Sequence, residues 1–181
     1  MDWIKGIDWE RLQHPHPSLR VFKCENPDDP TDPFFKKVAR FQRLAMKEYL
    51  WLSDEYRNEQ AIGVITNSYF FSGGFNVFYE TGDFQALIGF TDIISGFKCN
   101  MTFKLIDKDI WGADFARAAK ELFDLYIKEF RLKRISSETA DIRILRMAQM
   151  GGFVLEGTRP DAFRWNKKYY PIYTMGKYGG E

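Results

Sequence analysis

The side chains that most often carry nucleophilic or metal chemistry are few in this chain and stand apart from one another. Its two cysteines, Cys24 and Cys99, have no CxxC partner and no histidine nearby, so neither a disulfide framework nor a zinc site is indicated. Its two histidines, His14 and His16, are each followed by a proline and are expected in an exposed loop. No Ser-His-Asp or Cys-His constellation can be assembled from these residues, so any catalysis would depend on carboxylates, tyrosines and backbone groups.

The composition indicates one globular domain covering residues 1–181. The chain has 181 residues, of which 45% are hydrophobic and 17% aromatic, enough for one sizeable core. Its 26 Lys and Arg against 25 Asp and Glu leave almost no net charge. A balanced chain has no overall field to hold a phosphate backbone or an anionic membrane, which argues against nucleic acid as a partner.

The sequence predicts a cytoplasmic protein. No run approaches the roughly 18 apolar residues of a membrane span, and acidic residues interrupt the first apolar positions of the N-terminus, unlike a signal peptide. The isolated cysteines fit a reducing compartment.

The N-terminal part reads as an irregular segment followed by a helix. Prolines and aspartates concentrate in residues 1–31, with room for a short strand within 18–25. Asp32 is placed as an N-cap and Pro33 in the first turn of a helix, which apolar residues at helical spacing extend over 33–58.

The middle of the chain predicts an antiparallel meander. Runs of β-branched and aromatic residues are separated there by glycine-containing turns. The expected strands are 75–80, 84–94 and 97–107, and the stretch 61–70 is either a further strand or an irregular entry to the sheet.

The C-terminal half alternates helices and strands. Its expected elements are a helix over 113–131, a strand over 134–140, a helix from near Asp141 to Gly151 and Gly152, and strands over 153–159 and 168–176. This order excludes an all-parallel sheet and predicts an α+β fold with helices on the faces of a mixed sheet.

That order of elements, and three stretches of sequence, resemble the GNAT acetyltransferases and in particular their ribosomal-protein-modifying branch. FNVFYETGDFQALIGF at 75–90 looks like their second and third strands, joined by a tight T-G turn. Residues 141–159 are similar to the branch's N-x-x-S-x-R-V-L-x-x-x-G-F-x-x-E-G ending, with Asp141 in place of the asparagine, and RWNKKYYPIYTM at 164–175 to its last strand. The resemblance covers about 75–176 and implies a GNAT-like, mostly antiparallel twisted sheet flanked by helices.

The third stretch, WGADFA at 111–116, is similar to the family's W-G-x-G-Y-A loop. In the family this loop cradles the pyrophosphate of acetyl-CoA with backbone N–H groups at a helix N-terminus. Here Asp114 replaces the second glycine, and its carboxylate either repels the pyrophosphate or simply caps the helix. The resemblance implies acetyl-CoA as the acyl donor, held by the loop and the fourth strand, with the candidate contacts Phe103, Lys104, Leu105, Ile106, Gly112, Ala113, Asp114 and Phe115.

Acetyl transfer to an amine also needs a proton acceptor and a proton donor. Many relatives carry a tyrosine as general acid four residues before the G-F glycine, where this chain has Ala148. Three other tyrosines could take that role or belong to the core, namely Tyr126, Tyr169 and Tyr170. The candidate bases are the carboxylates on the elements where relatives place theirs, namely Glu138, Asp107 and Asp92.

Two functions remain open from the sequence. The favoured one is an N-acetyltransferase that moves an acetyl group from acetyl-CoA to an amine of a protein or small molecule. The alternative is a catalytically degenerate binding or assembly protein, like phage-encoded GNAT-like proteins with a similar I-R-x-L…G ending, which the chain's many aromatic residues would also suit. Neither the amine acceptor nor the oligomeric state, a homodimer included, can be predicted.

Overall fold

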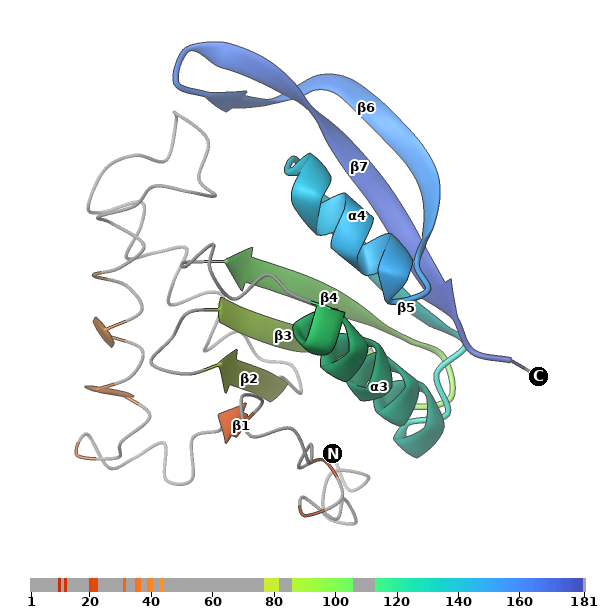
Figure 1. Cartoon of the computed structure of the whole chain (residues 1–181). Helices are drawn as coiled ribbons and strands as arrows, with labels where there is room; N and C mark the ends of the chain where they lie inside the picture. The colour runs from red at the N-terminus through yellow and green to blue at the C-terminus, as the bar shows by residue number, and fades with distance from the viewer. Residues whose placement is uncertain are drawn as a thin grey trace.

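A single mixed sheet organises the described part of the chain (Figure 1). The computed structural model describes residues 10, 12, 20–22, 31, 35–36, 39–40, 43, 77–81, 86–105 and 113–180. Its elements are β1 (Arg20–Phe22), β2 (Val77–Thr81), β3 (Ala86–Ile94), β4 (Lys98–Leu105), α3 (Ala113–Glu129), β5 (Arg134–Thr139), α4 (Ile142–Met150), β6 (Val154–Trp165) and β7 (Lys168–Tyr178).

The seven strands are arranged in the order β1-β2-β3-β4-β5-β7-β6. Every neighbouring pair is antiparallel except β4 and β5, which run parallel. A parallel pair needs a long crossover connection, and α3 lies within the chain segment that joins these two strands. The mixed, mostly antiparallel α+β sheet predicted from the sequence is therefore confirmed.

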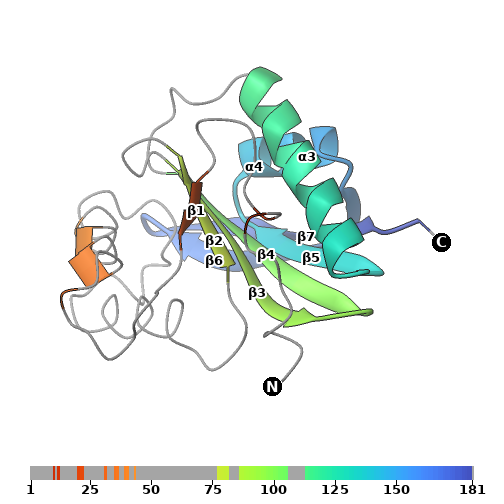
Figure 2. The same cartoon turned by 90° about the horizontal axis from the view of Figure 1, so that it is seen from below.

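The two described helices lie side by side on one face of the sheet, as Figure 2 shows. The apolar face of α3 is buried as its spacing predicts, and Tyr126 stacks on Phe90 of β3 with ring centroids 3.7 Å apart. Phe123 of α3 packs edge-on against Phe153, the residue before β6. The hydrophobic core is therefore the layer between these helices and the sheet.

The predicted bounds of α4 are confirmed at both ends. Asp141 is the N-cap and accepts a hydrogen bond from the backbone N–H of Arg143 at 2.8 Å. The helix stops at Gly151 and Gly152, and Gly152 takes a positive φ of 89° that suits glycine. Lys177 of β7 donates to the carbonyl of Gly151 at 2.8 Å, which ties the helix end to the sheet.

The last hairpin is longer than the sequence predicts. The expected strand ends at residue 159, yet β6 continues to Trp165 through a shift in register next to Pro160, which cannot donate to a ladder. A proline is tolerated there because β6 is an edge strand. The turn instead falls at Asn166 and Lys167, both at positive φ, as the tightest hairpins require.

The N-terminal predictions fall mostly outside the described residues. Within them, Arg20–Phe22 forms the short strand expected in 18–25, and residues 35, 36, 39, 40 and 43 are helical, in line with the predicted helix 33–58. The remainder of that helix and the stretch 61–70 are not described.

Candidate functional site

Strands β4 and β5 diverge from a short shared segment. Their pairing covers Lys98–Asn100 of β4 and Arg134–Ser136 of β5. Beyond it, β4 stays paired with β3 as far as Leu105, while β5 stays paired with β7 as far as Thr139. Within the described strands, β4 and β5 are therefore not paired with each other past this point, and Figure 1 shows their ends moving apart.

Side chains close the narrow end of this gap. Met101 and Ser137 are both buried, and Ser137 Oγ lies 4.0 Å from Met101 Sδ. Farther along, Phe103 of β4 and Thr139 of β5 line a cavity. The gap is thus filled at its apex and open at its mouth.

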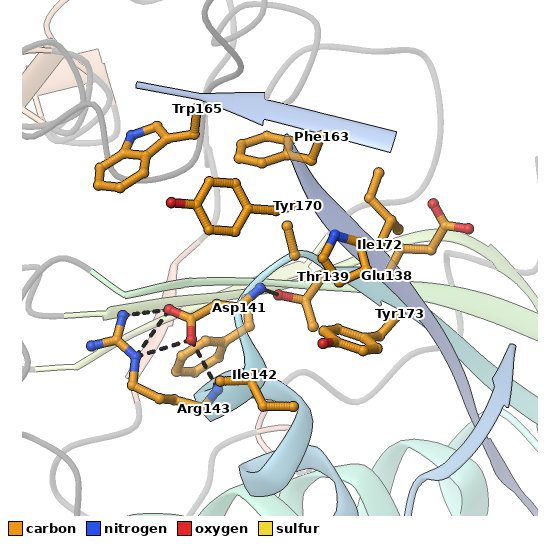
Figure 3. A pocket seen from close by; sticks show the side chains of 13 residues that line it. Glu138, Thr139, Asp141, Ile142, Arg143, Phe163, Trp165, Tyr170, Ile172 and Tyr173 are labelled. Carbon is orange, nitrogen blue, oxygen red and sulfur yellow. Dashed lines mark hydrogen bonds and ion pairs between the residues drawn. The ribbon is translucent and has the colours of Figure 1, made fainter. Parts of the chain in front are cut away.

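The cavity at the mouth has a volume of about 530 Å³, and its walls include five aromatic side chains (Figure 3). That size is typical of small-molecule sites. Its lining comes from the end of β4, the end of β5, the start of α4 and the last hairpin, and comprises Phe103, Glu138, Thr139, Ala140, Asp141, Ile142, Arg143, Phe163, Trp165, Tyr170, Pro171, Ile172 and Tyr173.

The hairpin supplies one aromatic wall. Phe163 of β6 is paired in register with Tyr170 of β7, so both side chains are on the same face of the hairpin. Trp165 meets Tyr170 edge-to-face, with ring centroids 6.1 Å apart. In Figure 3 the Tyr170 ring lies between Trp165 and the carboxylate of Asp141.

Asp141 and Arg143 form an ion pair at the start of α4. Asp141 Oδ1 accepts from Arg143 Nε at 2.9 Å, and Arg143 Nη2 donates to the other carboxylate oxygen. Burial is the largest single influence on the Asp141 carboxyl and raises its pKa, but the hydrogen bonds and charge of Arg143 together outweigh it, so the net pKa is lowered. Asp141 is therefore an anion at neutral pH, with its charge compensated.

Glu138, a predicted base, lies at the rim of the cavity. Its carboxylate accepts from Arg159 Nη2 at 2.7 Å and from Thr174 Oγ1 at 3.1 Å. Figure 3 shows this carboxylate pointing away from Asp141 and Tyr170. Glu138 would have to leave Arg159 before it could accept a proton from a group inside the cavity.

The other two predicted bases are placed differently. Asp92 lies at an irregularity of β3 with φ 52° and accepts from Asn100 Nδ2 at 2.9 Å. It is not among the described residues that line the cavity. Asp107 lies outside the described residues, so its role stays a prediction.

The predicted coenzyme contacts divide into three groups. Phe103 lines the cavity and packs against Phe115, which is buried in the core. Lys104 and Leu105 are the last two residues of β4, past its pairing with β5. Ala113 and Asp114 are the first two residues of α3. Ile106 and Gly112 lie outside the described residues.

Of the three candidate tyrosines, the structure brings only Tyr170 to the cavity. Tyr126 is fully buried in the core, and Tyr169 is 60% exposed, with Arg164 over its ring. Ala148, where relatives carry the general acid, is a fully buried residue of α4. The sequence did not single out Trp165, Phe163 or Arg143 as site residues, although the run of aromatics in the last hairpin was a signal for the first two.

Two further properties concern the described residues as a whole. No helix among them is long and apolar enough to cross a membrane. Their His, Cys, Asp and Glu side chains form no group of three that could hold a metal ion.

Solved structures similar to this chain include several acetyltransferases, whereas no family model and no curated protein sequence matches it. A chimera of the Vibrio cholerae spermidine N-acetyltransferase SpeG with hSSAT superposes with a TM-score of 0.62 at 13% identity, over 89% of this chain and 95% of that one. The microcin C7 self-immunity acetyltransferase MccE, bound to acetyl-CoA and AMP, gives 0.62 at 13% identity, over 90% and 93%. The ribosomal L7/L12 acetyltransferase RimL, bound to coenzyme A, gives 0.61 at 13% identity, over 90% and 94%.

Identities this low establish a shared architecture and nothing about the reaction. The chemistry must therefore be argued from the cavity and the strands that form it.

Proposed function

Because this chain has the fold of the GNAT acetyltransferases, we propose that it is an N-acetyltransferase that uses acetyl-CoA to acylate an amine of a small molecule or protein. The observation that carries the proposal is the divergence of β4 and β5 onto an aromatic cavity. A gap of this kind places the backbone of two strands beside a space for a substrate instead of beside each other.

The chain's backbone fits the donor substrate. The pantetheine arm of coenzyme A carries amide groups, and it could lie along the edge of β4 that faces away from β3, past the three residues that pair with β5. The start of α3 offers free N–H groups to a pyrophosphate. Asp114 in that first turn would weaken, without abolishing, the attraction for this anion.

The reaction requires few side chains. The amine nitrogen attacks the thioester carbonyl carbon, the C–N bond forms, the C–S bond breaks, the nitrogen loses a proton and the leaving thiolate gains one. Backbone N–H groups on the β4 edge would stabilise the charge that develops on the carbonyl oxygen. Tyr170 is the proposed proton donor, and Glu138, reached directly or through water, is the proposed acceptor of the amine proton.

One observation favours a second candidate, a GNAT-fold protein that binds but does not catalyse. Two carboxylates line the described part of the cavity, and each forms an ion pair with an arginine: Asp141 with Arg143 and Glu138 with Arg159. If these ion pairs persist in solution, the cavity lacks a base, and the chain would retain a binding site without acyl transfer.

Coenzyme binding tests the proposal. Thermal unfolding of the full chain is followed while coenzyme A is added to millimolar concentration. Ligand at about 100 times its Kd stabilises a folded protein by about 2.7 kcal/mol, so a rise in Tm is expected. Absence of any shift at millimolar coenzyme would overturn the acetyltransferase. A shift without acetylation of any amine in a mixed panel, followed by mass spectrometry, would support the binding protein.

A further inference from the structure

Each carboxylate in the described cavity wall is paired with an arginine, one of which, Arg159, lies outside the lining. The ion pairs Asp141–Arg143 and Glu138–Arg159 compensate both carboxylates among the described lining residues. A ligand with several positive charges would have to displace these arginines to find partners. Polycations are therefore poorly matched to this cavity.

Three aromatic residues of the wall belong to a part of the molecule away from the core. Phe163, Trp165 and Tyr170 are half-buried residues of the last hairpin, whose end extends past α4 in Figure 1. Figure 3 shows these three side chains gathered on one side of the cavity, opposite Asp141. Large rings that are not needed to fill a core are well suited to hold a planar, apolar group.

From this combination we propose that the acceptor is a monoamine with an aromatic body, which rests on the proposed function. The aromatic body lies against Trp165 and Tyr170. The single ammonium group is attracted by the faces of these rings and by the outer lone pairs of Asp141. This assigns the substrate class and sets the chain apart from the spermidine acetyltransferase that its fold resembles.

Three probe amines test whether binding depends on an aromatic ring and on the number of positive charges. 2-Phenylethylamine, 2-cyclohexylethylamine and spermidine are titrated into the full chain by calorimetry, with and without saturating coenzyme A. The first two share one charge and one chain length and differ in aromaticity. We expect 2-phenylethylamine to bind about tenfold more tightly than either of the others. Spermidine binding as tightly as, or more tightly than, 2-phenylethylamine would overturn the proposal.

Two substitutions locate the binding site. Trp165→Ala is expected to weaken 2-phenylethylamine binding about tenfold, because it removes one ring of the wall. Tyr169→Ala is the matched control, since Tyr169 neighbours Tyr170 in sequence but is exposed outside the cavity. Trp165→Phe keeps a ring and should retain most of the affinity, which covers the case in which Trp165→Ala fails to fold. Unchanged binding in a folded Trp165→Ala, or a loss in Tyr169→Ala equal to that in Trp165→Ala, would contradict the proposal. If Trp165→Ala does not fold, a loss of about tenfold in Trp165→Phe would contradict it.

The two proposals fail in different ways. Coenzyme A binding without any preference for the aromatic amine overturns the substrate class and leaves the acetyltransferase standing. Selective, Trp165-dependent binding of the aromatic amine without coenzyme A binding overturns the acetyltransferase and leaves a binding site of the stated specificity.

Discussion

Tyr170 differs from its neighbour Tyr169 in facing the cavity, and its hydroxyl can be removed without removing its ring. We predict that Tyr170→Phe lowers the turnover of amine acetylation by about 10²-fold or more, the usual contribution of a positioned proton donor. The rise in Tm caused by coenzyme A should be unchanged. Both effects are measured on the same protein by a thiol-release assay and thermal unfolding.

Tyr173→Phe is the matched control, because Tyr173 also lines the cavity. Full activity in Tyr170→Phe combined with a loss in Tyr173→Phe would move the role of proton donor to Tyr173. Full activity in both variants would show that neither phenol donates the proton.

Asp141 makes stability depend on pH through its lowered pKa. A carboxyl whose folded pKa lies below its unfolded value, about 3.9, contributes stability that is present above the unfolded pKa and is lost as pH falls through the folded pKa. Asp141→Asn keeps the N-cap of α4 but removes this titration. We expect the variant to lose less free energy of unfolding than the original chain between pH 5 and pH 2, measured by urea denaturation.

Asp141→Ala separates the cap from the charge. It should cost about 1 kcal/mol of unfolding free energy at pH 7, the usual value of a lost N-cap, whereas Asp141→Asn should cost less. Equal losses at pH 7 would show that the ion pair with Arg143, rather than the cap, is the source of stability.

At the scale of elements, Lys177 joins three of them. This buried side chain of β7 lies 2.7 Å from Asp124 of α3 and 2.8 Å from the carbonyl at the end of α4. Removing one partner of a buried ion pair costs about 3–5 kcal/mol of unfolding free energy. Asp124 is half-exposed and would still be paired with Lys120, so a smaller loss is expected. We predict a loss of about 2–3 kcal/mol for Lys177→Ala by urea denaturation.

Lys177→Met keeps most of the side-chain volume while removing the charge. If the ion pair and the bond to Gly151 stabilise the junction, both variants lose stability. A stable Lys177→Met beside an unstable Lys177→Ala would assign the effect to packing instead.

How far the sequence predicted these elements depended on whether their signals were local. Both described helices were predicted to within about two residues, because the apolar face of α3 and the cap at Asp141 lie within the segments that they define. The extent of β6 was not predicted. A proline such as Pro160 is tolerated within a strand at the edge of a sheet, and whether a strand lies at the edge depends on the order of all the strands. The cavity was out of reach for the same reason, because Phe103 and Tyr170 come from strands that pairing alone brings near each other.

At the scale of the whole molecule, a ligand that binds only the folded chain raises its global stability. We predict that Asp114→Gly enlarges the rise in Tm at a fixed coenzyme A concentration, because it removes a negative charge from the proposed pyrophosphate site. The comparison is with the same variant without coenzyme, since glycine in a helix costs up to about 1 kcal/mol. An unchanged shift would show that the carboxylate does not meet the coenzyme.

The divergence of β4 from β5 also bears on inheritance. Three residue pairs hold the two strands together, and the gap beyond them is bounded by main chain. A feature made of main chain tolerates nearly any exchange of side chains, and the overall fold is shared with solved structures at 13% identity. Under the proposed function, selection would act on the few residues at the mouth of the gap. New acceptors, or the loss of catalysis altogether, can arise there without rebuilding the domain.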